Sequence, residues 1–207
     1  CIRDSYGGLF IQLFIVYAII FVLFTRLNPF WFLRKMLPVI LFAFSTSSSN
    51  ATIPLNLETL ERKCGVDEKV ASFTIPLGAT INMSGTAIMQ GVAVVFVAQA
   101  FGIDLSTSAL MTVVITAVTA AIGTAGVPGV GTIMLAMVFE SVGLPAAGIA
   151  MIMGVDRILD MGRTAVNVTG DAVVTMCMAS LTKTLDRNVF QSRNEDLIEE
   201  PVKAPSE

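Results

Sequence analysis

The sequence predicts an all-α membrane protein, in which transmembrane helices alternate with two re-entrant helical hairpins that enter from opposite faces. Hydrophobic residues make up 54% of the 207 residues and charged residues only 14%, which differs strongly from the composition of soluble domains. Between Lys69 and Asp156 the only charged residues are Asp104 and Glu140, over a length of several bilayer widths. We therefore expect the lipid bilayer, and no nucleic acid, as the surroundings of this chain.

The first transmembrane helix is predicted within residues 1–27. Residues 9–24 are almost continuously apolar and are followed by Thr25 and Arg26. No positively charged stretch and no small-residue cleavage site precedes this run, which argues against a signal peptide. Because the chain begins at Cys1 and turns apolar within a few residues, we expect it to be a piece of a longer protein.

Residues 28–69 are predicted to form the first re-entrant hairpin. Basic residues lie toward both ends of this range, at Arg34 and Lys35 and again at Arg62 and Lys63, and the positive-inside rule puts both ends on the cytoplasmic side. The residues between them are too few for two full spans of about 20 residues each. The stretch "STSSSNATIP" would then turn inside the membrane, where irregular backbone is tolerated only if it lines a protein cavity.

Residues 70–103 are predicted to form a transmembrane helix that is interrupted in "LGATINMSGT", which holds glycines and polar residues. Residues 104–145 are predicted to form the second hairpin, because two short apolar stretches flank "GTAGVPGVG", whose glycines and proline cannot continue a helix. The loop "GIDLSTS" before it lacks Lys and Arg, as expected outside the cell. The second hairpin is therefore expected to enter from the face opposite to the first.

Residues 146–185 are predicted to form a polar transmembrane helix, which delivers basic residues to the cytoplasm. Its polar residues recur at steps of four, three, one, three and four, and so share one helix face: Asp156, Asp160, Arg163, Thr164, Asn167 and Asp171. Charges at the bilayer centre are costly, so this face is expected to line a cavity and meet a partner. Residues 186–207 are polar and acidic, and we expect a disordered tail with a cytoplasmic C-terminus.

The order of hairpin, broken helix, hairpin and polar helix is typical of an inverted-repeat transporter with a binding site near the bilayer midplane. In an alternative interpretation, both hairpins are ordinary glycine-rich loops between full helices, but the helix lengths and the charge distribution do not fit it. In another, Asp160 and Arg163 are only an internal ion pair. That interpretation leaves Asn167 and Asp171 unexplained.

A zwitterionic substrate would explain the polar face. Arg163 can bind a carboxylate in a bidentate manner, and Asp160 suits an ammonium group. Asn167 and Asp171, beside backbone oxygens freed near Asn82, provide the hard oxygen ligands that an alkali cation needs.

An enzyme and a passive channel are the two other classes of function that these polar residues could indicate. The sequence contains no histidine, which excludes a Ser–His dyad and an HExxH zinc site, and its three cysteines have no paired spacing. An intramembrane aspartyl protease would need two facing aspartates without an adjacent arginine. A passive channel would need a continuous polar lining, whereas the polar residues here gather at one depth. We therefore expect no enzyme.

Four motifs in order, "TSSSNATIP", "PLGATINMSGT", "GTAGVPGVG" and "LDMGRTAVNVTGD", resemble the glutamate/aspartate transporters of the dicarboxylate/amino acid:cation symporter family. The resemblance covers about residues 10–184 and corresponds to the sixth transmembrane helix through the C-terminus. It implies alternating-access uptake of aspartate or glutamate with Na⁺, in a plasma or bacterial inner membrane, by a homotrimer of the full-length protein. A proton-coupled dicarboxylate or amino acid carrier of the same fold is the alternative.

The resemblance also implies which residues bind substrate and cations. The substrate site would use residues of both hairpin tips, the broken helix and the polar helix: Ser48, Ser49, Asn50, Thr86, Val127, Gly131, Asp160, Arg163, Thr164 and Asn167. One sodium site would use Gly78, Asn82, Asn167 and Asp171. Another would use backbone oxygens of Thr80, Met83, Ala121, Ile122 and Thr124, and the second hairpin would be the extracellular gate.

Two positions depart from the family pattern. Ser84 stands in "NMSGT" where family members commonly have aspartate, which puts a further sodium site and the ion stoichiometry in doubt. Gln90 stands where animal members coupled to protons and potassium have glutamate, so potassium counter-transport is not expected.

Overall fold

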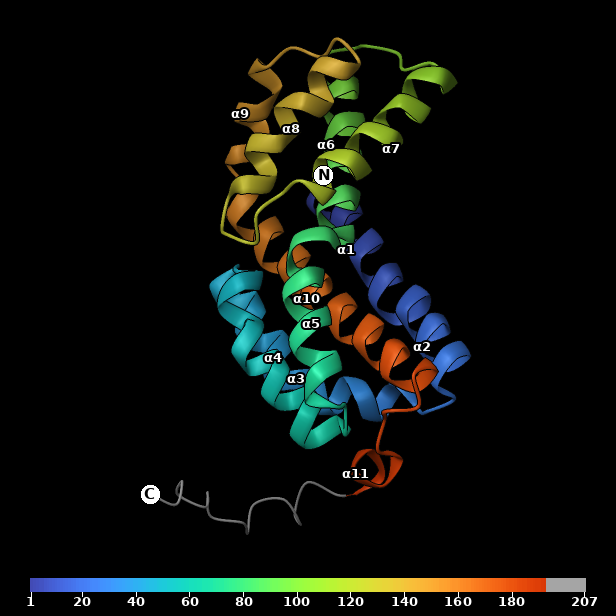
Figure 1. Cartoon of the computed structure of the whole chain (residues 1–207). Coiled ribbons are helices and arrows are strands. Elements are labelled where there is room, and N and C mark those ends of the chain that lie inside the picture. The colour runs from blue at the N-terminus through green and yellow to red at the C-terminus, as the bar shows by residue number, and fades with distance from the viewer. Residues whose placement is uncertain (193–207) are drawn as a thin grey trace.

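The computed structural model describes residues 1–192, and every regular element in that range is helical (Figure 1). The elements are α1 (Ile2–Ile11), the π-helical turn η1 (Gln12–Val16), α2 (Tyr17–Thr25), α3 (Pro29–Thr46), α4 (Ser49–Cys64), α5 (Glu68–Ile81), α6 (Ser84–Ala100), α7 (Thr107–Ile122), α8 (Val130–Ser141), α9 (Ala147–Met153), α10 (Asp156–Leu181) and α11 (Arg187–Gln191). The predicted all-helical class is confirmed. The predicted tail beyond residue 192 lies outside the described residues.

Three helical segments are long and apolar enough to cross a membrane: Ile2–Thr25, Glu68–Ala100 and Asp156–Leu181. They overlap the three full spans expected from the sequence within residues 1–27, 70–103 and 146–185. The apolar helices Thr107–Ile122 and Val130–Ser141 are shorter, because the glycines and proline between them end one helix before the next begins. The entry of both hairpins into the membrane stays a prediction.

The first hairpin consists of α3 and α4, which pack against each other. Asn28 caps the start of α3 by accepting a hydrogen bond from the Phe30 amide, and Pro29 occupies the first helical position, where its missing N–H costs nothing. At the tip Ser47 adopts a left-handed conformation with φ of 53°. Ser48 then caps α4 by accepting a hydrogen bond from the Ala51 amide at 3.2 Å. The serine run therefore contains both the end of α3 and the start of α4.

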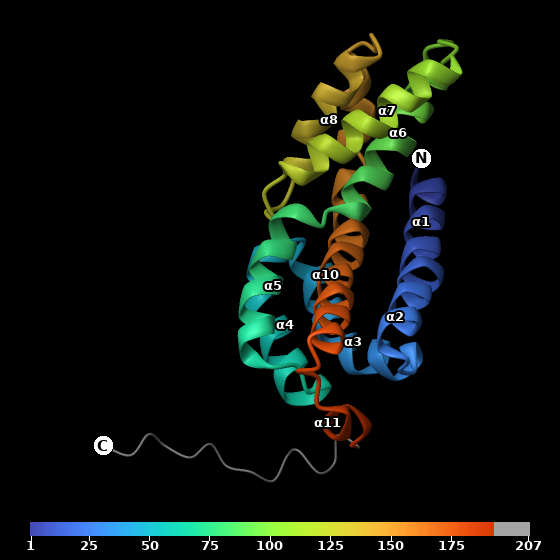
Figure 2. The same cartoon turned by 45° about the vertical axis from the view of Figure 1, so that its right-hand side comes forward.

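The predicted interruption of the long helix lies between α5 and α6. Asn82 (φ −98°, ψ 72°) and Met83 (φ −106°, ψ 44°) leave the helical region, which releases backbone groups from the intrahelical ladder. Figure 2 shows the offset between α5 and α6 beside the middle of α10.

The second hairpin consists of α7 and α8, and its tip meets the tip of the first. The Gly126 carbonyl accepts hydrogen bonds from the Asn50 amide at 3.1 Å and from the Ser48 hydroxyl at 2.9 Å. Figure 2 shows α7 and α8 at one end of the molecule and α3 and α4 at the other, with the tips near the middle. The two hairpins thus approach each other along α10.

Two apolar cores flank this meeting point. One contains Phe21, Phe32, Met36, Leu60 and Met176, and the other contains Met89, Val97, Leu135, Phe139 and Leu159. The central part of α10 lies between them, in contact with helices α2 to α6. Polar residues on α10 are therefore buried at a junction rather than inside either core.

Two ranges differ from the expectation. Residues 146–185, predicted as one helix, contain α9 and α10, which are separated at Gly154 and Val155. Residues 187–191, predicted as part of the tail, form α11, because Phe190 is buried against Phe21 with ring centroids 6.4 Å apart. Apolar burial at this aromatic residue offsets the entropy of ordering the segment.

Candidate functional site

The site is built on the polar face of α10, whose central residues are buried. The predicted residues Asp160, Arg163, Thr164, Asn167 and Asp171 are all no more than 4% exposed, while Asp156 at the start of the helix is half-buried. Steps of three and four residues align them on one side, and neighbouring helices cover that side. Buried charges of this kind require partners.

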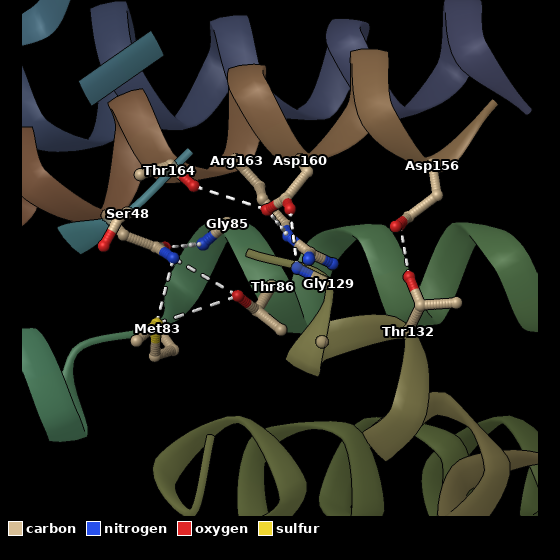
Figure 3. Close-up of polar contacts among 12 residues, drawn as sticks. Ser48, Met83, Gly85, Thr86, Gly129, Thr132, Asp156, Asp160, Arg163 and Thr164 are labelled. Carbon is tan, nitrogen blue, oxygen red and sulfur yellow. Dashed lines mark hydrogen bonds and ion pairs between the residues drawn. The ribbon is translucent and has the colours of Figure 1, made fainter. Parts of the chain in front are cut away.

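Asp160 and Arg163 form an ion pair at the centre of the site (Figure 3). Arg163 Nε donates to Asp160 Oδ1 at 2.8 Å, and the Gly129 amide of the second hairpin donates to Asp160 Oδ2 at 2.9 Å. The Thr164 hydroxyl lies 3.4 Å from Asp160 Oδ1. Arg163 Nη1 is buried and has no hydrogen-bond partner among residues 1–192, so one side of the guanidinium is left for a ligand.

Arg163 and the two hairpin tips line a cavity of about 10 Å³. Its wall combines residues of both tips, the broken helix and α10, namely Ser47, Ser49, Met83, Thr86, Thr124, Ala125, Gly126, Val127, Gly131, Asp160, Arg163, Thr164 and Asn167. This volume holds about one water molecule, so a larger ligand can enter only if the groups that line the cavity move.

The predicted hairpin-tip residues divide into two groups. Ser49, Val127 and Gly131 line the cavity, whereas the Ser48 hydroxyl donates to Gly126 and so joins the two tips. The Asn50 side chain also points toward Gly126: a Cβ on that glycine would lie 2.7 Å from Asn50 Oδ1. Ser48 and Asn50 are thus placed to hold the tips together, outside the cavity wall.

Asn167 connects α10 to the broken helix. Its Oδ1 accepts from the Gly85 amide at 2.7 Å, and its Nδ2 donates to Thr86 Oγ1 at 3.2 Å and lies 3.1 Å from Met83 Sδ. Figure 3 shows Gly85, Thr86 and Met83 gathered opposite α10. Gly85 must be glycine for this approach, since a Cβ would lie 2.7 Å from the Arg163 carbonyl.

Asp171 is a buried carboxylate with a single neutral partner. Asn82 Nδ2 donates to its Oδ1 at 2.9 Å, and no Lys or Arg among residues 1–192 forms an ion pair with it. Gly78 lies so close that a Cβ would be 2.7 Å from Oδ1. A buried carboxylate without a cation is costly, and this oxygen-rich surrounding fits an alkali cation. The predicted residues Gly78, Asn82, Asn167 and Asp171 are thus brought together.

The second predicted cation set lies where two helices end. Thr80 lies in the last turn of α5 and Met83 in the break before α6, while Ala121 and Ile122 end α7 and are followed by Thr124. The two chain segments lie side by side, since a Cβ on Gly126 would be 3.2 Å from the Ala79 carbonyl. Helix C-termini carry unpaired carbonyl groups, which can bind a cation.

Three contacts at the site were not expected from the sequence. The Gly129 amide holds Asp160, the Thr132 hydroxyl donates to Asp156, and the hydroxyls of Tyr17 and Ser84 are hydrogen-bonded at 2.5 Å. Nearly every residue carries a backbone amide, so the type of residue at position 129 does not indicate the contact with Asp160. The side-chain pairs join residues 24 and 67 positions apart, which local spacing does not indicate.

Comparison with known proteins agrees with the resemblance. The model of the sodium:dicarboxylate symporter family matches residues 4–181. Excitatory amino acid transporter 3 of Mus musculus is 44% identical over 177 residues, 86% of this chain and 34% of the relative. Neutral amino acid transporter A of Bos taurus is 39% identical over 203 residues, which are 98% of this chain and 38% of the relative. Excitatory amino acid transporter 1 of Rattus norvegicus is 40% identical over 190 residues, 92% and 34%.

The chain spans about a third of the length of these relatives. The family match covers most of the chain and includes the interrupted helix, both hairpin tips and the polar face of α10. These are the elements that build the site. The chain belongs to the sodium:dicarboxylate symporter family.

Proposed function

We propose that this chain is the transport core of a secondary active symporter that takes up aspartate or glutamate together with sodium. The observation that carries the proposal is the buried Arg163, whose Nη1 has no partner among residues 1–192 and which lies beside a carboxylate at the wall of a small cavity. A cation and an anion held at one buried point suit a zwitterion with an additional carboxylate.

Each end of the substrate has a chemical counterpart in the site. The side-chain carboxylate would bind Arg163 through a charge-assisted hydrogen bond to the free side of the guanidinium. The ammonium group would bind Asp160, and the α-carboxylate would meet hydroxyl and amide donors of the tips and Thr164. Because Asp160 already balances Arg163, an acidic amino acid adds net negative charge to the pocket.

Sodium is the co-substrate that would neutralise this charge. Asp171 and Asn167 lie on the same helix face as the substrate groups, one to two turns further on, and Asp171 lacks a basic partner among residues 1–192. Proton coupling is the alternative, since a proton on Asp171 would relieve the same buried charge. In either case substrate and cation should tighten each other's binding by the same factor.

Access from the outer side would be controlled by movement of the second hairpin. The cavity is too small for an amino acid, and the tip between α7 and α8 is rich in glycine, including Gly129 at φ of 82°. A tip of this composition can change its backbone angles at little steric cost. The complete protein would be a multi-pass membrane homotrimer with a cytoplasmic C-terminus.

The relatives include transporters named for excitatory and for neutral amino acids, so family membership alone leaves the substrate class open. Arg163 favours the acidic class, because its Nη1, which has no partner among residues 1–192, would stay unpaired beside a neutral side chain. A C4 dicarboxylate would satisfy Arg163 but would leave Asp160 without an ammonium group.

The test is uptake by a reconstituted complete protein that contains this chain. Liposomes with an imposed inward sodium gradient should accumulate labelled aspartate, and preloaded unlabelled aspartate should accelerate its entry by exchange. A proton gradient alone should drive little uptake. Accumulation that follows the proton gradient and ignores sodium would support the proton-coupled alternative, and uptake without exchange or accumulation would indicate a channel.

A further inference from the structure

The second hairpin contacts α10 at a point outside the proposed substrate groups. The Thr132 hydroxyl, in the first turn of α8, donates to Asp156 Oδ1 in the first turn of α10 (Figure 3). One turn further along α10, the Gly129 amide donates to Asp160 at 2.9 Å. The hairpin is therefore fastened at two successive turns of the same helix.

This outer contact joins a buried threonine to a half-buried aspartate. Thr132 is buried at 7% exposure, and its amide donates to the Gly129 carbonyl at 3.2 Å, which fixes the start of α8. Asp156 forms no ion pair with any residue of the described chain, 1–192. Thr132 is its one side-chain partner there, so neither group has a competing local contact within that range.

The two contacts differ in how they respond to substrate. Asp160 is the proposed partner of the substrate ammonium, so its bond to Gly129 changes when the site is occupied. Asp156 lies a full turn away from Asp160, outside the cavity wall, and its bond to Thr132 can persist in the empty site. A contact that does not depend on ligand shifts the balance between the open and closed states by the same amount with and without substrate.

We infer that Thr132 and Asp156 form a latch, which holds the second hairpin closed against α10 and sets how often the site opens. The inference rests on the proposed function, in which this hairpin is the gate. Thr132 and Asp156 are positioning residues: they touch neither substrate nor cation, and they act through the backbone of the tip that covers Arg163.

Asp156 could also act only by stabilising the start of α10, and the experiment must distinguish this role from the latch. A carboxylate in the first turn of a helix is favourable next to the helix dipole, and this effect needs no threonine. Thr132→Val removes only the hydroxyl donor and leaves Asp156 at the start of α10. Thr132→Ser retains the hydroxyl and should restore the latch.

The experiment measures opening directly, with a thiol probe beneath the hairpin. Ser47 is 2% exposed and lines the cavity, and its hydroxyl has no partner among residues 1–192. Ser47→Cys therefore breaks no hydrogen bond within that range and places a buried thiol in the cavity wall. Cys1 is partly exposed and Cys64 and Cys177 are buried elsewhere, and the background of all three is measured without the probe. The probe is introduced into the complete protein, and its reaction with a polar maleimide is followed in sodium-free buffer without substrate.

Thr132→Val should accelerate labelling of the probe about tenfold, as expected for loss of about 1.4 kcal/mol from a charge-assisted hydrogen bond. Thr132→Ser should label at nearly the original rate. The matched control is Thr119→Val on α7, whose hydroxyl bonds only its own helix at the Ile115 carbonyl. In the double variant with Asp156→Asn, the two effects should be less than additive.

Equal labelling rates for Thr132→Val and Thr119→Val would overturn the latch. Full additivity with Asp156→Asn would do the same. The proposed function is judged separately, by aspartate uptake of the protein without the probe: accelerated labelling in a protein that transports no amino acid would support the latch and reject the function.

Discussion

Arg163 is the residue on which the proposed substrate choice depends. Arg163→Thr should lower the affinity for aspartate and glutamate by about tenfold to a hundredfold, because a charge-assisted hydrogen bond contributes about 1.5–3 kcal/mol. Neutral amino acids should bind instead. Competition of unlabelled amino acids with labelled substrate measures this change.

The matched control for this substitution is Arg157→Thr. It makes the same charge change on the same helix, but at an exposed side chain without an ion pair among residues 1–192, and should leave affinity within about twofold. An Arg163→Thr protein that still binds aspartate as tightly as the original would disprove the assignment.

Asp171 is the residue on which the proposed sodium coupling depends. Asp171→Asn keeps the side-chain size and removes the charge that the cation would balance, so substrate affinity should become nearly independent of sodium. Calorimetric titration with aspartate across a sodium series measures this dependence, and Asp104→Asn in an exposed loop serves as the control. Unchanged sodium dependence in Asp171→Asn would contradict the assignment, and affinity that follows pH rather than sodium would indicate proton coupling.

Ser84 occupies a polar position close to Asn82 and pairs with Tyr17. Ser84→Asp would add a carboxylate there, and buried carboxylates recruit cations. We expect substrate affinity to depend on sodium with a higher order than in the original protein. The same calorimetric series detects it, and an unchanged order would show that this position does not govern stoichiometry.

At the scale of helices and turns, glycines decide how closely the second hairpin packs on α10. A Cβ at Gly131 would collide with the Arg163 guanidinium, whereas at Gly123 the nearest atom would be 3.8 Å away, which is an ordinary contact. Gly131→Ala should therefore hold the tip open and weaken substrate binding by about tenfold or more, since small-to-large changes in packed sites cost about 1–3 kcal/mol.

Gly123→Ala in the same hairpin tip is the control for this substitution and should bind substrate nearly as before. Both variants can be compared by substrate titration and by the labelling rate of the Ser47→Cys probe. Equal behaviour of the two alanine variants would mean that packing on Arg163 does not limit closure.

At the scale of the whole molecule, the described residues leave a broad apolar surface on η1 and α2. Phe14, Ile15, Ile19 and Leu23 are all more than half exposed, and they require lipid or other protein segments as cover. We expect the 207-residue chain alone neither to trimerise nor to transport, because the family relatives are about three times longer. Light scattering of the purified chain and aspartate uptake in liposomes test this expectation, and a trimeric, active chain would contradict it.

Much of the architecture follows from the sequence alone. Long apolar segments with few charges predict spanning helices, and the three found in the structure agree with them, because hydrocarbon excludes both charge and unpaired backbone. The polar residues of α10 could be assigned to one face from their spacing, since helical geometry is a local property. The serine run and the "GTAGVPGVG" stretch indicated the turns for the same reason.

The tertiary structure alone decided how these parts meet. It brought the Gly129 amide to Asp160 and the Ser48 hydroxyl to Gly126, and it paired Thr132 with Asp156. It also ordered α11 through the burial of Phe190. Every residue except proline carries the same backbone amide, so residue type does not reveal which amide will bind a carboxylate. Contacts between segments far apart in the chain depend on the packing of whole helices, which local periodicity does not encode.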